Sequence, residues 1–171
     1  MHKFPSIEQF RHVIKSVEFR TRFTGEMSEE GYPVLLEREY YELPVLRFHG
    51  STKLHGSNAS VVSAPGEALA TQSRSQVITP ENDNYGFSRW VLTDVPLGVW
   101  DHINASIFTV EELANKECIV FGEWCGKGIQ KSVAISALDK MFVIFGAKVY
   151  DVDDESGESG EWIPLSRIED P

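Results

Sequence analysis

The sequence predicts an α+β fold built on a mainly antiparallel sheet with flanking helices. Two segments rich in Val, Ile and Phe, ECIVFGEW at 117–124 and KMFVIFGAKVYDV at 140–152, predict long strands. Two shorter β-prone segments lie on either side of Pro65-Gly66, a dipeptide that favours a turn between antiparallel strands. The 171 residues include ten Phe, five Tyr and four Trp, which is enough for the packed core of one domain.

The first expected element is a helix from Ser6 to about Phe19. Its apolar residues recur at helical spacing: Phe10, Val13, Ile14 and Val17. Ser6 and Gln9 stand three residues apart and fit a capping box at the start of this helix. Residues 20–33 are polar and include two glycines and a proline, so we expect a loop there. The apolar segment VLRFHG at 45–50 is expected to form a strand.

The middle of the chain is expected to add a strand pair and short helices. NASVVSA at 58–64 and ALATQSRS at 68–75 are the two strands expected to pair around the Pro65-Gly66 turn. GFSRWVLTDVPLGVWDHINASI at 86–107 carries aromatic residues at helical spacing and is interrupted by Pro96, which predicts one or two short helices.

Charge is distributed unevenly along the chain. The net charge is −10, from 16 Lys and Arg against 26 Asp and Glu, which argues against generic nucleic-acid binding. However, residues 151–171 hold eight of the acids and one of the bases, which leaves 18 acids and 15 bases in residues 1–150. We therefore divide the chain into a near-neutral domain at 1–150, with room for a local basic groove, and an acidic C-terminal segment at 151–171.

The chain carries no signal for a membrane or for secretion. No apolar run reaches membrane-spanning length, and MHKFPSIEQF at the start lacks the apolar core of a signal peptide. The protein is therefore expected in the cytoplasm or another intracellular compartment, without a membrane partner. Cys118 and Cys125 are then expected to be small core residues rather than a disulfide. A zinc site would need four ligands, and no histidine cluster lies near the pair.

The segment STKLHGSNAS at 51–60 is the first candidate for chemistry. Lys53 follows an apolar stretch and enters a polar turn, a setting that can favour the neutral amine required of a lysine nucleophile. Gly56 permits close approach of the backbone to a phosphate, and the hydroxyl and amide side chains around it can bind phosphate or ribose. On residue type alone, Lys53 is more often a surface lysine and His55 a structural histidine. The later segment GEWCGKGIQKS does not have P-loop spacing.

Four segments in residues 44–150 resemble four motifs of one enzyme family and occur in the same order as those motifs. KLHGSN at 53–58 is similar to the motif that carries the nucleotidylated lysine of polynucleotide ligases and capping enzymes. QSRS at 72–75, FGEWCGKGIQK at 121–131 and MFVIFGAKV at 141–149 follow it. Together they resemble the RNA ligase 2 family, in which His is found at the third motif position where DNA ligases and capping enzymes usually have Asp. Four ordered matches are much more specific than one lysine motif.

The resemblance implies an ATP-dependent RNA ligase, with residues 1–150 forming part of a nucleotidyltransferase domain of the ATP-grasp-like ligase adenylation type. In such enzymes lysine attacks the α-phosphate of ATP to form lysyl-AMP, and AMP passes to an RNA 5′-phosphate. An RNA 3′-OH then displaces AMP and seals the strand. The expected ligands are ATP, Mg2+ and RNA with 5′-phosphate and 3′-OH ends.

The resemblance also implies catalytic roles for three residues of the first motif. Lys53 would be the nucleophile. His55 and Asn58, two and five places further on, would support the later steps at the phosphates and the strand end.

Nucleotide binding is expected from residues of all four motifs. Gly56 would let the backbone approach phosphate, and Arg74 would bind phosphate through its guanidinium, although a strand-edge salt bridge is its common structural role. Glu123 would contact a ribose hydroxyl or a magnesium-bound water, although most such carboxylates are solvated. Phe145 would stack on adenine, although most such rings pack in a core. We expect these side chains to converge with Lys53 on one groove, with the ring face of Phe145 turned toward it.

One feature departs from the family pattern. The family continues with a glutamate-glycine motif and a pair of lysines that bind the α-phosphate, and neither is evident in the 26 residues after Phe145. The sequence is therefore expected to be the N-terminal part of a longer ligase, in preference to a degenerate relative. Two further alternatives are a non-catalytic module that binds nucleotide or RNA, and a DNA ligase or capping-type nucleotidyltransferase.

Overall fold

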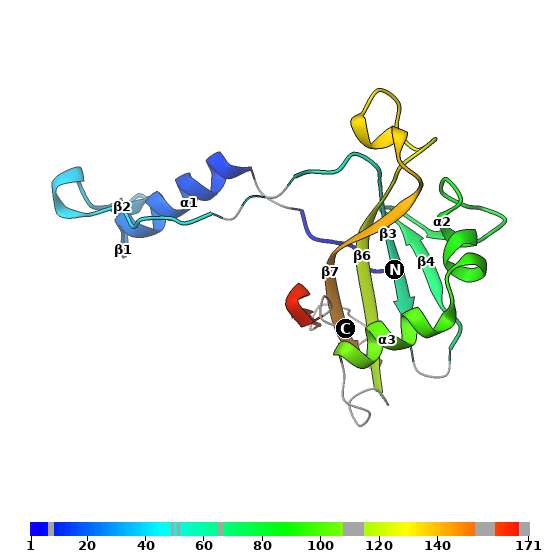
Figure 1. The fold of residues 1–171 in the computed structure, drawn as a ribbon. Coiled ribbons are helices and arrows are strands. Elements are labelled where there is room, and N and C mark those ends of the chain that lie inside the picture. Colours follow the sequence, from blue (N-terminus) through cyan, green and yellow to red (C-terminus); the bar gives the residue numbers. More distant parts are fainter. Residues whose placement is uncertain are drawn as a thin grey trace. The chain divides into compact units, whose positions relative to one another are not determined.

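The computed structural model describes residues 1–6, 9–48, 50, 52–64, 67–107, 115–152 and 160–167. The chain divides into two compact units. The larger unit comprises Met1–Phe4 and Lys53–Pro171, and the smaller comprises Pro5–Thr52. Figure 1 shows the elements of both units along the chain.

The larger unit is built on a six-stranded sheet in the order β5-β4-β3-β6-β7-β8, in which all neighbours are antiparallel. Its strands are β3 (Ser57–Ser63), β4 (Ala70–Ser73), β5 (Val77–Ile78), β6 (Lys116–Cys125), β7 (Met141–Asp151) and β8 (Glu161–Ile163). The α+β class is therefore confirmed, as are both long strands. The predicted pairing of the shorter strands is also confirmed, since β3 and β4 pair from Ala59 with Ser73 to Val62 with Ala70. The predicted turn at Pro65-Gly66 lies outside the described residues.

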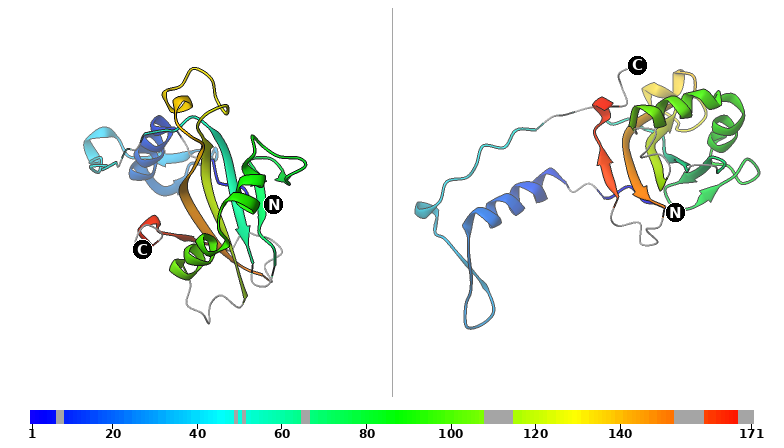
Figure 2. Two further views of the ribbon diagram at one scale, coloured as in Figure 1. Left: turned by 45° about the vertical axis from the view of Figure 1, so that its right-hand side comes forward. Right: turned by 90° about the horizontal axis from the view of Figure 1, so that it is seen from below.

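The short helices predicted after β5 are present and cover one face of the sheet. They are α2 (Phe87–Arg89), which continues as a π-helical turn over Trp90–Asp94, and α3 (Leu97–Ile107). Their buried residues pack against alternate residues of β3 and β6, and Figures 1 and 2 show both helices on the same side of the sheet. The resulting main core contains Ala59, Val61, Phe87, Val91, Trp100, Ile103, Val120 and Trp124. We call this side the helix-covered face.

The other side of the sheet, which we call the second face, carries a smaller aromatic cluster. Ile119, Phe121 and Tyr150 are buried there, and Phe4 and Phe145 pack against them. Successive residues of a strand point to opposite faces. Ile119 and Phe121 therefore point to the second face, while their neighbours Cys118 and Val120 point to the helix-covered face. The Met1–Phe4 segment therefore lies across the sheet from α3, as Figure 2 shows in its right-hand view.

The smaller unit contains α1 (Phe10–Arg22) and a hairpin of β1 (Phe23–Met27) with β2 (Pro33–Leu35). The loop predicted at residues 20–33 is therefore wrong. The turn residues belong to the hairpin, in which Gly31 adopts a φ of 81° and the Tyr32 N–H donates to Ser28 Oγ. All five residues of β1 are exposed, so the strand has none of the apolar alternation that would reveal it in the sequence.

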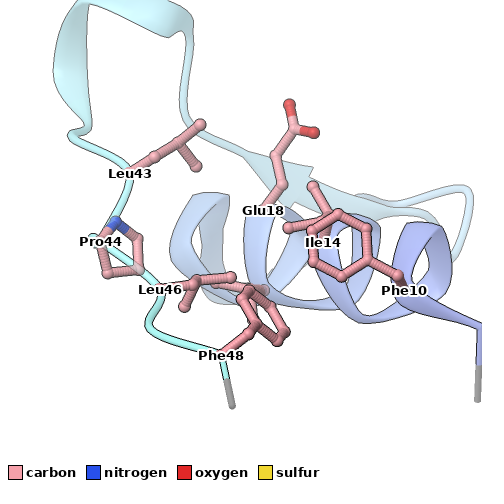
Figure 3. Close-up of a pocket in the computed structure, with 8 residues that line it drawn as sticks. Phe10, Ile14, Glu18, Leu43, Pro44, Leu46 and Phe48 are labelled. Carbon is pink, nitrogen blue, oxygen red and sulfur yellow. The ribbon is translucent and has the colours of Figure 1, made fainter. Parts of the chain in front are cut away.

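Two other predictions for the smaller unit are wrong. The helix begins at Phe10, and the extended backbone of Gln9 makes no side-chain cap, so the capping box with Ser6 does not form. Residues 45–48 form no strand, and His49 lies outside the described residues. Leu46 and Phe48 instead line a pocket of about 340 Å³ together with side chains of α1 (Figure 3). Their apolar character thus reflects packing on a helix rather than on a sheet.

No helix in the described part of the chain combines the length and the apolar character needed to cross a membrane.

The two cysteines are buried in the larger unit as free thiols, as predicted. Burial raises the pKa of Cys118 to about 12. The pKa of Cys125 is also raised, mainly by burial and to a smaller extent by the negative charge of Glu123.

The raised pKa values predict very slow thiol chemistry in the folded protein. At pH 8 the reactive thiolate fraction of Cys118 should be about a thousandfold smaller than that of an ordinary cysteine. We expect a disulfide reagent to label neither thiol of the folded protein within minutes, and to label both at once in guanidinium chloride. Rapid labelling of Cys118 under native conditions would contradict its placement in the core.

Candidate functional site

The segment from Lys53 to Gly56 leads directly into β3. Lys53 and His55 are exposed, whereas Leu54 is half-buried. Ser57, the first residue of β3, pairs with Trp124 near the end of β6. This register places the lysine segment at the end of the sheet where β3 begins and β6 ends.

A hydrogen bond joins the first and third motifs at this end of the sheet. The Gly56 N–H donates to Glu123 Oε1 at 2.8 Å, although the two residues are 67 positions apart. Asn58 stands directly opposite Glu123 in the register of β3 and β6, so both side chains project from the same face. Since Glu123 alternates with Phe121, that face is the second face.

The Gly56 carbonyl is held as well, by a residue that sequence reasoning missed. Gln130 Nε2 donates to Gly56 O at 3.1 Å from the loop that follows β6. Gln130 lies within the FGEWCGKGIQK segment, which is the only signal that could have identified it. Glu123 and Gln130 together fix the peptide groups on both sides of Gly56, and therefore the position from which the lysine segment departs.

Gly56 itself has no room for a side chain. A Cβ atom there would collide with the Trp124 carbonyl oxygen and lie 2.7 Å from Cys125 Cβ. The predicted approach of Gly56 to a phosphate stays a prediction, and packing against β6 is a second reason for glycine at this position.

Replacing Gly56 with alanine is therefore expected to displace the lysine segment. The added methyl group meets backbone atoms that cannot rotate away, so we expect a loss of about 1–3 kcal/mol in the free energy of unfolding. Urea denaturation measures this loss, and His55→Ala, at the exposed neighbouring position, is the control. An unchanged unfolding midpoint for Gly56→Ala would contradict the packing described above.

Phe145 reaches the second face because of a β-bulge. Phe121 pairs with Gly146 and Gly122 pairs with Ile144, so Phe145 is an extra residue in β7. Ile144 packs in the main core, whereas Phe145 packs with Phe121 on the opposite side. Without the bulge, Phe145 would pair with Gly122 and point to the helix-covered face, away from Glu123 and Asn58.

Arg74 lies in the bend between β4 and β5 and is exposed. It follows Ser73, which pairs with Ala59 near the start of β3. Arg74 therefore lies at the same end of the sheet as Lys53. The structure thus brings Gly56, Asn58 and Glu123 together and places Phe145 on their face, while convergence of all the predicted residues on one groove stays a prediction.

Metal ligands are sparse in the described residues. Within these ranges, no group of three or more His, Cys, Asp or Glu side chains lies close enough to hold an ion. Glu123 is half-buried, and one of its oxygens already accepts the Gly56 N–H. Its carboxylate suits a single contact to a metal-bound water, which is the limited role expected from the sequence.

Comparison with known proteins agrees with this arrangement of motifs. The family model described as RNA ligase matches residues 46–170, which include every predicted site residue and all six strands of the sheet. This match is consistent with the resemblance to RNA ligase 2 and implies a nucleotidyltransferase domain. A search of curated proteins found no match. The match spans well over half of the chain, and the protein belongs to the RNA ligase family.

Proposed function

We propose that this protein is an ATP-dependent RNA ligase in which Lys53 carries the AMP. The observation that supports this most strongly is the hydrogen bond from the Gly56 N–H to Glu123, because it couples the lysine motif to the third motif. The family match supports RNA ligase activity, and the covalent AMP mechanism is the proposal.

The residues on the second face fit a purine nucleotide. Phe145 offers a half-buried aromatic ring for stacking, on the face that also carries Asn58 and Glu123. Arg74 and Lys53 supply positive charge at the end of the sheet where β3 begins, and both are exposed. A base on the sheet and phosphates at its end would match this separation of aromatic and cationic groups.

In the proposed first step, the neutral Lys53 amine attacks the α-phosphorus of ATP. A P–N bond forms, the bond to the bridging oxygen breaks, and pyrophosphate leaves with that electron pair. In the second step an oxygen of the RNA 5′-phosphate attacks the AMP phosphorus and the P–N bond breaks. In the third step the RNA 3′-OH attacks the 5′-phosphorus, and AMP leaves as the strand is sealed.

Magnesium would neutralise the charge that develops on the phosphates during these steps. In the proposed site it is held mostly by water and by ATP, with Glu123 as the contact from the protein. The exposed side chain of His55 and the half-buried side chain of Asn58 would then serve the RNA phosphate and strand end.

Intact-mass measurement tests the proposal on the longest natural chain. After incubation with ATP and Mg2+, we expect a mass increase of one AMP group, which peptide mapping should place on Lys53. A GTP adduct without an ATP adduct would indicate a capping-type enzyme, and sealing of nicked DNA in preference to RNA would indicate a DNA ligase. Reversible ATP binding without any adduct would indicate a non-catalytic binding module.

A further inference from the structure

Residues Met1–Phe4, which we call the arm, are anchored on the second face through His2. The His2 main-chain N–H donates to Gln72 Oε1 at 3.0 Å, and Gln72 is only 2% exposed. His2 Nε2 lies 2.9 Å from Glu117 Oε1, and the His2 ring lies 4.6 Å from that of Tyr150. The arm thus binds side chains of β4, β6 and β7 at once.

Phe4 carries the second anchor, and it lies against the proposed base-binding residue. Its ring centroid is 4.9 Å from that of Phe145, 5.4 Å from that of Phe121 and 5.2 Å from that of Trp162, and all three contacts are edge-to-face. A Cβ atom at Gly146 would be 3.0 Å from the Phe4 ring. Phe4 therefore covers the sheet at Gly146, directly beside the bulged Phe145.

We propose that the arm is an autoinhibitory lid, and that a nucleotide base must displace Phe4 before it can stack on Phe145. This inference rests on the proposed function, since it takes Phe145 as the residue that holds the base. An aromatic side chain already lies in edge-to-face contact with Phe145, and a purine placed there would compete with Phe4 for the same apolar surface.

The arm is suited to release because its anchors are few. They comprise one main-chain hydrogen bond, one contact between His2 and Glu117, and the packing of the His2 and Phe4 rings on four aromatic rings of the sheet. Burial lowers the pKa of His2, with Glu117 opposing this effect and Lys148 and the N-terminal amine adding to it. A released His2 therefore takes up a proton more readily than a docked one, so docking should weaken as the pH falls through 6.5.

The affinity for ATP tests this lid. In a Lys53→Arg background, where no adduct accumulates, Phe4→Ala and His2→Ala should each lower the Kd for ATP by roughly 3- to 30-fold, because the open state is no longer rare. Lys3→Arg is the matched control, since the Lys3 side chain on the same arm is exposed. An unchanged or raised Kd in Phe4→Ala would overturn the lid and make Phe4 a supporting wall of the site.

A measurement on the unsubstituted arm covers the case in which Phe4→Ala does not fold. Nuclear Overhauser contacts between the Phe4 and Trp162 rings should be present in the free protein and lost on saturation with ATP. Persistence of these contacts with ATP bound would overturn the lid while leaving the proposed function intact. Failure of every variant to bind ATP would overturn both.

Discussion

Replacing Lys53 with arginine is expected to abolish formation of the AMP adduct and to leave the fold intact. Arginine keeps the positive charge, but its guanidinium stays protonated and cannot attack phosphorus. Lys53 is exposed and precedes β3, so the substitution disturbs no core packing. We expect the adduct measured by intact mass to fall by on the order of a thousandfold or more, with unchanged circular dichroism.

Sealing of a pre-adenylylated RNA separates the lysine's role from a general loss of activity. That substrate already carries the AMP, so Lys53→Arg should seal it far better than it seals ordinary 5′-phosphate RNA with ATP. Replacement of the exposed neighbour His55 should have the opposite effect to Lys53→Arg. We expect His55→Ala to form the AMP adduct normally and to be impaired in the later steps. An AMP adduct that persists at the wild-type level in Lys53→Arg would remove Lys53 as the nucleophile.

Replacing Glu123 with alanine is expected to lower the rate of adduct formation by about 100-fold, because a shift of the lysine segment by one ångström has an effect of that order. The substitution removes the acceptor for the Gly56 N–H as well as the proposed contact to magnesium. Glutamine separates these two roles, since its carbonyl oxygen can still accept the Gly56 N–H but carries no charge. We expect the rate of adduct formation in Glu123→Gln to be about tenfold higher than in Glu123→Ala. We also expect Glu123→Gln to need a higher magnesium concentration than the wild type.

Rates of adduct formation over a series of Mg2+ concentrations measure both effects. If Glu123→Gln matches the wild type at every concentration, Glu123 positions Gly56 and does not contact the metal. If Glu123→Ala also matches the wild type, both roles are wrong. The buried position of its strand neighbour Trp124 makes a thermal-unfolding control necessary for each variant.

The parts of the fold that the sequence predicts are those in which apolar pattern and burial agree. The two long strands are rich in Val, Ile and Phe, and every residue in them except Asp151 is buried or half-buried. The shorter strand β3 places its apolar residues Ala59 and Val61 in the main core. The hairpin of β1 and β2 escapes prediction because its side chains are exposed and its stability comes from backbone pairing. The strand predicted at residues 45–48 is wrong because a short apolar segment can form a strand or can pack against a helix, and its sequence does not distinguish the two.

The site shows a similar division. The ordered motifs single out Lys53, Glu123 and Phe145 as candidates one by one, because each residue type suits the chemistry proposed for it. They do not reveal that Gln130 holds the Gly56 carbonyl, nor that the arm lies over Phe145. Both are contacts between residues far apart in the chain, and no local spacing encodes them.

The bulge at Phe145 has a consequence for how strand β7 tolerates change in length. Because Gly146 and Ile144 pair with the consecutive residues Phe121 and Gly122, deletion of Phe145 would leave a regular ladder with every other side chain on its present face. Deletion of a paired residue such as Ala147 would instead reverse the facing of all residues on one side of the gap. Phe145 therefore behaves as a one-residue insertion, which could be gained or lost without rebuilding the sheet.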